Sequence, residues 1–249
     1  MNTDATIDKL RSMRLDGMAE AYHNQRSDPA VTQLSFDERF GMLVESHWLH
    51  ESNRAMQRRL SYAKLRQNAS IEQIDWTRPR GMTRELIAQL STGEWIRYGQ
   101  NCIITGATGV GKSWLACALA QKACRDGYRA LYTYSPKLFR ELLAANIDGS
   151  LTKMIRRLAR LDLLVIDDLG MEVAKRSQYR DFLELIDERH GQKATLLTSQ
   201  YPPENWHEVI RDPTVGDAIV DRLIHGAYRI DLVGDTMRNL TPQKDSEEA

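Results

Sequence analysis

The sequence predicts an α/β protein: a parallel β-sheet covered by helices on both faces, preceded by a small all-helical domain. Between about residue 100 and residue 232, short apolar segments alternate with helical segments, which is typical of a parallel sheet buried on both sides. The residues before that region read as helix, and a glycine-rich loop follows the first apolar strand. We therefore expect a helical domain at 1–68, an α/β domain at 69–240 and a polar, disordered tail at 241–249.

The amino-terminal domain is expected to contain two helices. The first, at Thr6–Arg26, ends at the breaker Ser27-Asp28-Pro29. The second begins at Ser35, because a serine followed by glutamate three residues later satisfies the free amides of a helix start, and it extends to about Arg66. Apolar side chains behind Ser35 recur at helical spacing: Phe36, Phe40, Leu43, Val44 and Trp48. Two helices bury little surface alone, so we expect this pair to pack weakly on itself or on a partner.

The α/β domain follows a transitional stretch at 71–98. Strands are expected at 102–105, 129–134, 163–166, 194–198 and 228–232. Helices are expected at 112–125, 135–146, 151–160, 177–190 and 218–225. Too few residues follow Gln200 for a last strand plus a helical lid, so we expect no full carboxy-terminal lid.

Composition excludes a membrane-spanning chain and a secreted disulfide scaffold. No apolar run approaches the ~20 residues that cross a bilayer, and the charged amino terminus does not fit a signal peptide. The cysteines are odd in number and lack zinc-type spacing; we expect reduced core thiols in a cytoplasmic protein. They are Cys102, Cys117 and Cys124.

The net charge is zero, but two basic clusters make candidate DNA-binding surfaces. One contains Arg54, Arg58, Arg59 and Arg66; the other contains Lys153, Arg156 and Arg157. In the first cluster Arg54, Arg58, Tyr62 and Arg66 fall at four-residue intervals, which places three guanidinium groups on one face of a helix. A solvated charged face is the alternative interpretation.

The glycine-rich loop matches the phosphate-binding pattern G-x-x-x-x-G-K-[ST] in full. Its glycines let successive amides point at phosphates, and the helix after it adds its positive end. Lys112 is expected to reach the β- and γ-phosphates, and Ser113 to bind Mg²⁺. The candidate ATP-binding residues are Gly106, Ala107, Thr108, Gly109, Val110, Gly111, Lys112, Ser113 and Trp114. A chance glycine-rich turn is the alternative, but the preceding strand and following helix argue against it.

Two carboxylates end the apolar strand at 163–166, at the sheet edge where open α/β sheets hold their ligands. Asp167 is the candidate Mg²⁺ ligand, and Asp168 is the candidate that orients and deprotonates the attacking water. A plain acidic turn is the alternative. No Asn-Lys-x-Asp motif for guanine occurs, which favours ATP over GTP.

Three further polar residues are weaker catalytic candidates. Thr198 or Ser199, at the end of the fourth strand, would touch the γ-phosphate or the water; a plain strand terminus is the alternative. Arg222 would act as an arginine finger on a neighbouring subunit's ATP, unless it forms an intramolecular pair with Asp221.

Taken together, these motifs resemble the AAA+ ATPases of the IstB type, the helper proteins of a large group of bacterial insertion sequences. The resemblance covers nearly the whole chain and includes the segments 10–19, 106–119, 163–170, 197–202, 219–223 and 225–232. The ATPase motifs alone are shared with the DnaC helicase loaders; the amino-terminal segment and the tail favour IstB. The usual pattern has Glu where Asp168 stands, so we expect slow turnover.

The resemblance implies a regulator of DNA transposition that binds double-stranded DNA, assembles on it as an ATP-dependent homo-oligomer, and recruits or activates a cognate transposase. Two alternatives stay open. A helicase loader of the DnaC type would bind a replicative helicase and prefer single strands. A small-molecule P-loop enzyme would transfer phosphate to a soluble acceptor without stimulation by DNA.

Overall fold

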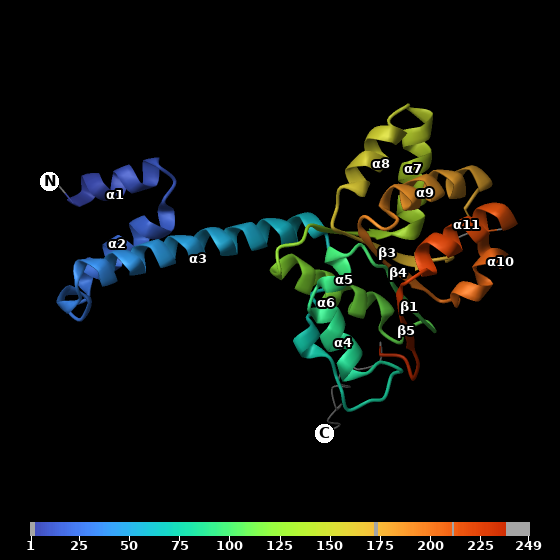
Figure 1. Cartoon of the computed structure of the whole chain (residues 1–249), viewed down its shortest axis with the longest axis horizontal. Helices are drawn as coiled ribbons and strands as arrows, with labels where there is room; N and C mark the ends of the chain where they lie inside the picture. The colour runs from blue at the N-terminus through green and yellow to red at the C-terminus, as the bar shows by residue number, and fades with distance from the viewer. Residues whose placement is uncertain (1–2, 172–173, 211, 238–249) are drawn as a thin grey trace, which may run out of the picture. The chain divides into compact units, whose positions relative to one another are not determined.

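The computed structural model describes residues 3–171, 174–210 and 212–237. The chain divides into two compact units, Met1–Arg58 and Arg59–Ala249, and the elements of each can be followed in Figure 1. The division falls inside a long helix, earlier in the chain than the domain boundary expected at residue 68.

The first unit is helical, but its first helix is interrupted. The prediction of one helix at Thr6–Arg26 is wrong, because α1 (Thr3–Ser12) and α2 (Asp16–Ser27) are separate. Arg14 lies between them with a left-handed φ of 61°, which no α-helix accommodates. Helix α2 packs closely on the next helix at Gly17, whose carbonyl accepts a 3.2 Å hydrogen bond from the Ser46 hydroxyl.

Helix α3 (Phe36–Ala63) begins as predicted. The Ser35 amide donates to the Glu38 carboxylate over 2.8 Å, and the Glu38 amide donates back to the Ser35 hydroxyl over 3.3 Å. The helix ends three residues before Arg66, because Lys64 turns into the left-handed region at a φ of 50°. The expected extension to Arg66 is therefore wrong.

The second unit contains the predicted parallel sheet. Its strands are β1 (Cys102–Gly106), β2 (Ala130–Tyr134), β3 (Leu163–Leu169), β4 (Ala194–Ser199) and β5 (Tyr228–Leu232). All neighbouring strands are parallel, in the order β2-β3-β4-β1-β5. The carboxyl ends of β1, β3 and β4 therefore lie side by side at one edge.

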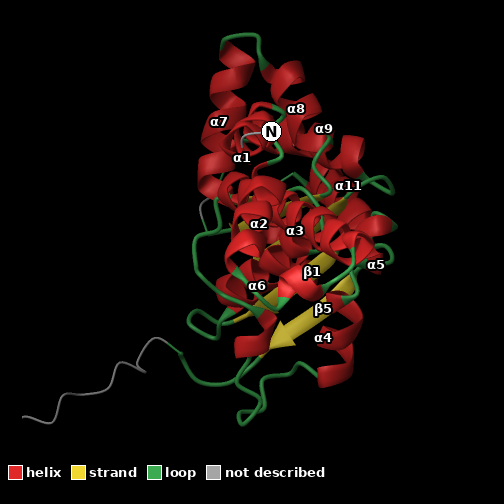
Figure 2. Ribbon diagram, turned by 90° about the vertical axis from the view of Figure 1, so that its left-hand side faces the viewer, coloured by secondary structure: helices red, strands yellow, loops and turns green. Residues whose placement is uncertain are grey.

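Helices cover both faces of this sheet, as predicted (Figure 2). Alternate side chains of β3 point into two cores: Leu163 and Val165 pack toward α6, while Leu164 and Ile166 pack toward α7 and α9. The helices of this unit are α4 (Arg84–Ser91), α5 (Glu94–Arg97), α6 (Lys112–Arg125), α7 (Ser135–Ile147), α8 (Leu151–Ala159), α9 (Arg176–Arg189), α10 (Trp206–Ile210) and α11 (Pro213–Ile224). Helix α11 begins five residues before the start expected at residue 218 because Asp212 caps it and Pro213 opens it.

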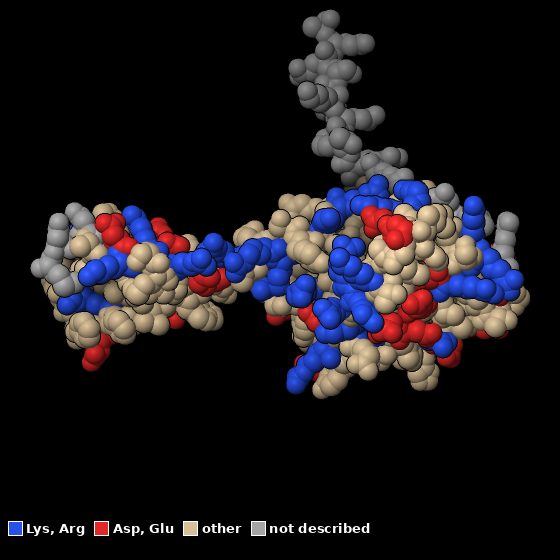
Figure 3. Space-filling model, turned by 90° about the horizontal axis from the view of Figure 1, so that it is seen from above, with Lys and Arg blue, Asp and Glu red and all other residues tan. Residues whose placement is uncertain are grey.

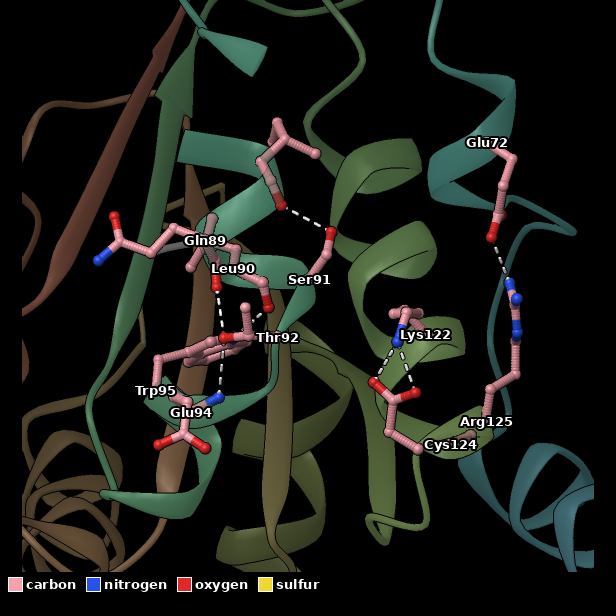
Figure 4. Close-up of polar contacts among 12 residues, drawn as sticks. Glu72, Gln89, Leu90, Ser91, Thr92, Glu94, Trp95, Lys122, Cys124 and Arg125 are labelled. Carbon is pink, nitrogen blue, oxygen red and sulfur yellow. Dashed lines mark hydrogen bonds and ion pairs between the residues drawn. The ribbon is translucent and has the colours of Figure 1, made fainter. Parts of the chain in front are cut away.

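The stretch at 71–98 is more regular than the sequence indicated. It contains α4, α5 and the 3₁₀ turn Ile71–Gln73. Figure 4 shows two contacts of this stretch: the Trp95 indole donates to the Leu90 carbonyl over 2.8 Å and joins α5 to α4, and Glu72 pairs with Arg125 at the end of α6 over 2.7 Å. The ion pair connects the 3₁₀ turn to helix α6.

Two other structural expectations concern the chain end and the cysteines. In the described residues after β5, as far as Met237, no helical lid follows. All three cysteines are free and buried, and burial raises the pKa of the Cys102 thiol to about 12.

Arg189 is a buried cation that joins α9 to the end of α8, to the loop before β3 and to the start of β4. Its side chain is 1% exposed and donates to the carbonyls of Leu158 and Leu161 over 2.7 and 3.0 Å, and to the Thr195 hydroxyl over 3.1 Å. Arg189→Met should lower the free energy of unfolding by roughly 3 kcal/mol or more, because it leaves several buried acceptors without donors. Denaturant unfolding measures this. The exposed Arg180→Met on the same helix is the control, and equal small losses in both variants would contradict the prediction.

Candidate nucleotide-binding site

The glycine-rich loop connects β1 to α6 in the conformation that a phosphate cradle requires. Gly106, Gly109 and Gly111 all have left-handed or otherwise positive φ values, of 140°, 91° and 102°, which side-chain-bearing residues rarely adopt. A Cβ at Gly106 would collide with the Leu232 carbonyl, and one at Gly109 with the Thr236 side chain. The glycines are thus required both by the turn and by the neighbouring chain.

Lys112 opens helix α6 and turns back over the loop. Its side chain is buried, and Nζ donates to the carbonyls of Gly106 and Ala107, both over 2.9 Å. The ammonium group and the first turn of α6 therefore lie at the same concave loop. This arrangement provides positive charge and hydrogen-bond donors for a polyphosphate.

Asp167 is held by the strands on both sides of β3. The carboxylate is fully buried. One oxygen accepts a 2.6 Å hydrogen bond from the Thr198 hydroxyl on β4, and the other accepts a 2.5 Å bond from the Tyr132 hydroxyl on β2. The orientation of this candidate metal ligand is therefore determined by two neighbours.

Asp168 differs from Asp167 in backbone and exposure. It is half-buried and has a left-handed φ of 57° at the point where the register between β3 and β4 shifts. Such a conformation costs a residue with a side chain of order 1 kcal/mol or more and is concentrated at functional sites. Its amide donates to the Thr198 hydroxyl over 2.8 Å, so Thr198 contacts both acids.

The two candidates on β4 have different partners. Thr198 bridges Asp167 and Asp168, whereas the Ser199 hydroxyl donates to the Leu169 carbonyl over 2.8 Å and accepts from the Tyr201 amide. The geometry therefore brings Thr198, and not Ser199, to the acids.

A cavity of about 630 Å³ lies in front of the loop, within the size range of small-molecule and cofactor sites. Its wall includes predicted residues, namely Thr108, Gly109, Gly111, Lys112, Ser113, Trp114 and Asp168. It also includes residues that the sequence did not single out, namely Gln67, Gln73, Asp75, Arg80, Met171, Gln200 and Met237.

Most of the unforeseen wall is formed by the linker before α4 and the segment after β5, while Met171 and Gln200 follow β3 and β4. The Val233 amide donates to the Arg80 carbonyl over 3.1 Å, and the Met237 amide donates to the Gly109 carbonyl over 2.9 Å. The Arg80 guanidinium also contacts the Met237 sulfur. The chain after β5 therefore lies over the glycine-rich loop, and no local sequence pattern signals this.

The groups present fit ATP with magnesium. The loop offers a phosphate cradle, and the Ser113 hydroxyl and the Asp167 carboxylate are the hard oxygen donors that Mg²⁺ prefers. Among the described residues, His, Cys, Asp and Glu form no group of three or more that would cage a metal by themselves. A metal here would take its remaining ligands from phosphate and water, as Mg²⁺ commonly does.

Arg222 lies far from this cradle within the chain. Its guanidinium pairs with Asp187 of α9, and not with Asp221. Its carbonyl accepts a 3.1 Å hydrogen bond from the side chain of Asn101. Asn101 immediately precedes β1 in the chain. Arg222 is therefore at the amino edge of the sheet, opposite the edge that carries the glycine-rich loop.

The candidate DNA-binding residues occupy different environments. Arg54 and Arg58 are exposed on α3, with Arg54 3.5 Å from Glu51, while Arg59 donates to the Cys124 carbonyl over 2.8 Å. On α8, Ile155 and Leu158 are buried and the basic residues Lys153, Arg156 and Arg157 are exposed. Figure 3 shows Lys and Arg side chains gathered along α3 and over a second region on the larger unit. Arg66, beyond the end of α3, is beside Tyr132 and Tyr134.

Residues 8–245 match the family model described as IstB-like ATP binding protein. The chain belongs to this family. An insertion sequence ATP-binding protein of Sinorhizobium fredii is 44% identical over 94% of this chain and 95% of its own length. The IS21 ATP-binding protein of Pseudomonas aeruginosa is 26% identical over 96% of this chain and 94% of its own length.

Solved structures with the same fold include replication proteins. DnaI superposes with a TM-score of 0.58 at 21% identity, covering 71% of this IstB-family chain and 94% of DnaI. The DnaC helicase loader gives a TM-score of 0.52 at 22% identity, covering 69% and 100% of the two chains. These similarities show an AAA+ fold. No helix within the described parts of the chain has the length and apolar character needed to span a bilayer.

Proposed function

We propose that this IstB-family chain is an ATP-hydrolysing regulator of DNA transposition that assembles on double-stranded DNA and recruits or activates a cognate transposase. The site geometry supports the ATPase part: a phosphate cradle and two acids, linked by Thr198, meet at one edge of the sheet. The insertion-sequence relatives support the transposition part. We place the protein in the cytoplasm, as a homo-oligomer whose assembly requires ATP and DNA.

Each residue of the site has a role in the proposed reaction. Lys112 and the amides of the loop would bind the phosphates, while Ser113 and Asp167 would hold Mg²⁺, which would neutralise charge on the transferring phosphoryl group. Asp168 orients the attacking water and accepts its proton. Thr198 fixes the relative position of the two acids through its hydrogen bonds to both. Asp168 is one methylene shorter than glutamate, which accounts for the slow turnover we expect.

We propose that the amino-terminal helical domain at 1–68 contacts the phosphate backbone of the DNA. Arg54 and Arg58 are exposed at four-residue spacing on α3. Like charges at this spacing cost an isolated helix a few tenths of a kcal/mol, and a polyanion would remove this repulsion. Arg59 and the exposed residues Lys153, Arg156 and Arg157 supply further candidate contacts.

Arg54→Glu together with Arg58→Glu should weaken binding to every duplex sequence alike and leave ATP binding unchanged. Each lost phosphate contact should make the slope of log K against log salt shallower by about 0.9. Fluorescence anisotropy at several salt concentrations measures both quantities. Arg11→Glu together with Arg26→Glu carries the same charge change on the same unit and serves as the control. An unchanged slope in the α3 variant would mean that this face is merely solvated and that the contacts are to be sought on α8.

The fold shared with the DnaC helicase loader favours one alternative function, loading of a helicase. The same anisotropy experiment with single-stranded DNA separates the two proposals. A transposition regulator should prefer the duplex, whereas a loader should prefer the single strand and bind a replicative helicase.

A further inference from the structure

Asp167 receives a hydrogen bond from β2 that the roles above do not use. Tyr132 is 8% exposed, and its hydroxyl donates to the second carboxylate oxygen of Asp167 over 2.5 Å. The pairing of β2 with β3 places Tyr134, not Tyr132, directly opposite Asp167. Tyr132 therefore reaches diagonally across the sheet, a distance that a long aromatic side chain spans.

The Tyr132 hydroxyl is itself in contact with a cation. A hydrogen bond between the Arg66 guanidinium and the Tyr132 oxygen, together with the charges of Asp167 and Asp168, raises the pKa of Arg66. The same guanidinium lies 5.9 Å from the centroid of the Tyr134 ring. A phenol has one proton to donate and lone pairs to accept with, so Arg66 can donate to Tyr132 while Tyr132 donates to Asp167.

This chain of contacts starts where α3 ends. Ala63 is fully buried and Lys64 takes a left-handed conformation, which turns the chain out of the helix just before Arg66. The turn removes Arg66 from the helical spacing of Arg54 and Arg58 and directs it toward β2. Arg66 is exposed, so the turn of the backbone, and not burial of its side chain, sets its position beside β2.

The two hydrogen bonds leave further lone pairs on the Asp167 carboxylate. A carboxylate has about four lone-pair sites, of which Thr198 and Tyr132 each take one. The two hydrogen bonds come from opposite neighbouring strands, so they oppose rotation of the carboxylate. The lone pairs that remain keep a fixed direction.

We propose that Tyr132, supported by Arg66, is a positioning residue that holds the Asp167 carboxylate in the orientation that binds Mg²⁺. This inference rests on the proposed ATPase function. Hydrogen-bond partners of metal ligands commonly contribute 10–100-fold in metal affinity or activity. Tyr132 and Arg66 are therefore expected to act on the metal requirement and not on nucleotide affinity as such.

The test is the Mg²⁺ dependence of nucleotide binding in Tyr132→Phe, which keeps the ring and removes the hydroxyl. Binding of a fluorescent ATP analogue is titrated first in EDTA and then with increasing Mg²⁺. We expect an unchanged Kd in EDTA and a roughly 10-fold or greater rise in the Mg²⁺ concentration that gives half-maximal enhancement. Tyr228→Phe, whose hydroxyl accepts from Gln89 far from the acids, is the matched control and should behave as wild type.

Arg66 is tested by the same titration in two variants. Arg66→Gln should raise the Mg²⁺ requirement in the same direction as Tyr132→Phe, and Arg66→Lys, which restores the positive charge, should recover part of it. An unchanged Mg²⁺ requirement in Tyr132→Phe would overturn the proposal, and so would an equal loss of binding in EDTA and in Mg²⁺, which indicates general damage to the site. Failure of the wild-type protein to bind the analogue at all would instead contradict the proposed function.

Discussion

Lys112→Ala is expected to abolish ATP binding, whereas Asp168→Asn is expected to preserve binding and lower hydrolysis by at least about 10²-fold. Lys112 contributes its charge to phosphates of the bound ground state from a buried position inside the loop. Asp168 acts on the attacking water, so its loss affects the rate and not the affinity. Equilibrium binding of a fluorescent ATP analogue and steady-state phosphate release measure the two effects.

One control variant lies on the same helix as Lys112, and a second variant on β4 tests the contact beside Asp168. Lys122→Ala removes a lysine of α6 that pairs with Asp126 away from the cavity, and it should leave both quantities unchanged. Thr198→Val removes the hydroxyl between the acids and should lower the rate without a comparable loss of binding. Normal turnover in Asp168→Asn would contradict the proposal that Asp168 orients the attacking water. Asp167 or a residue of a neighbouring subunit would then have to position the water.

Arg222→Ala is expected to lower the ATPase rate of the assembled protein by roughly 10³-fold, the effect of an arginine finger where one operates. Arg222 is at the sheet edge opposite its own cradle, so a catalytic role requires a neighbour's ATP. Mixing Arg222→Ala subunits with Lys112→Ala subunits should restore part of the activity, because each supplies the residue that the other lacks. Phosphate release by the mixture measures the rescue.

A further variant tests the alternative that Arg222 only stabilises the fold. Asp187→Asn removes the partner of Arg222 and leaves the guanidinium in place. If the pair only stabilises the fold, Asp187→Asn and Arg222→Ala should lower the melting temperature and the activity alike. If Arg222→Ala and Lys112→Ala subunits assemble together and the mixture shows no ATPase activity, Arg222 does not act across a subunit boundary.

The sheet and the cradle were predictable because their signals are local. Each strand is a short apolar run beside a turn, and the loop is a continuous pattern whose glycines have the positive φ values it requires. Asp167 and Asp168 end one such run, so their arrival at the carboxyl edge follows from a parallel sheet. The family resemblance is confirmed by the family model.

The contacts that could not be predicted join segments that are distant in the sequence. Tyr132 reaches Asp167 only because β2 and β3 are neighbours, and apolar runs do not reveal strand order. Met237 reaches Gly109 because β5 is beside β1. Arg222 forms its ion pair with Asp187 on helix α9 and not with Asp221, because adjacent residues on a helix do not face each other.

The most direct test of the proposed function is the ATPase rate with and without duplex DNA, with particle size measured on the same samples. A DNA-assembled transposition regulator should hydrolyse ATP faster with the duplex and form larger particles only when ATP and DNA are both present. An unchanged rate and an unchanged particle size, with phosphate transferred to a soluble acceptor, would contradict it.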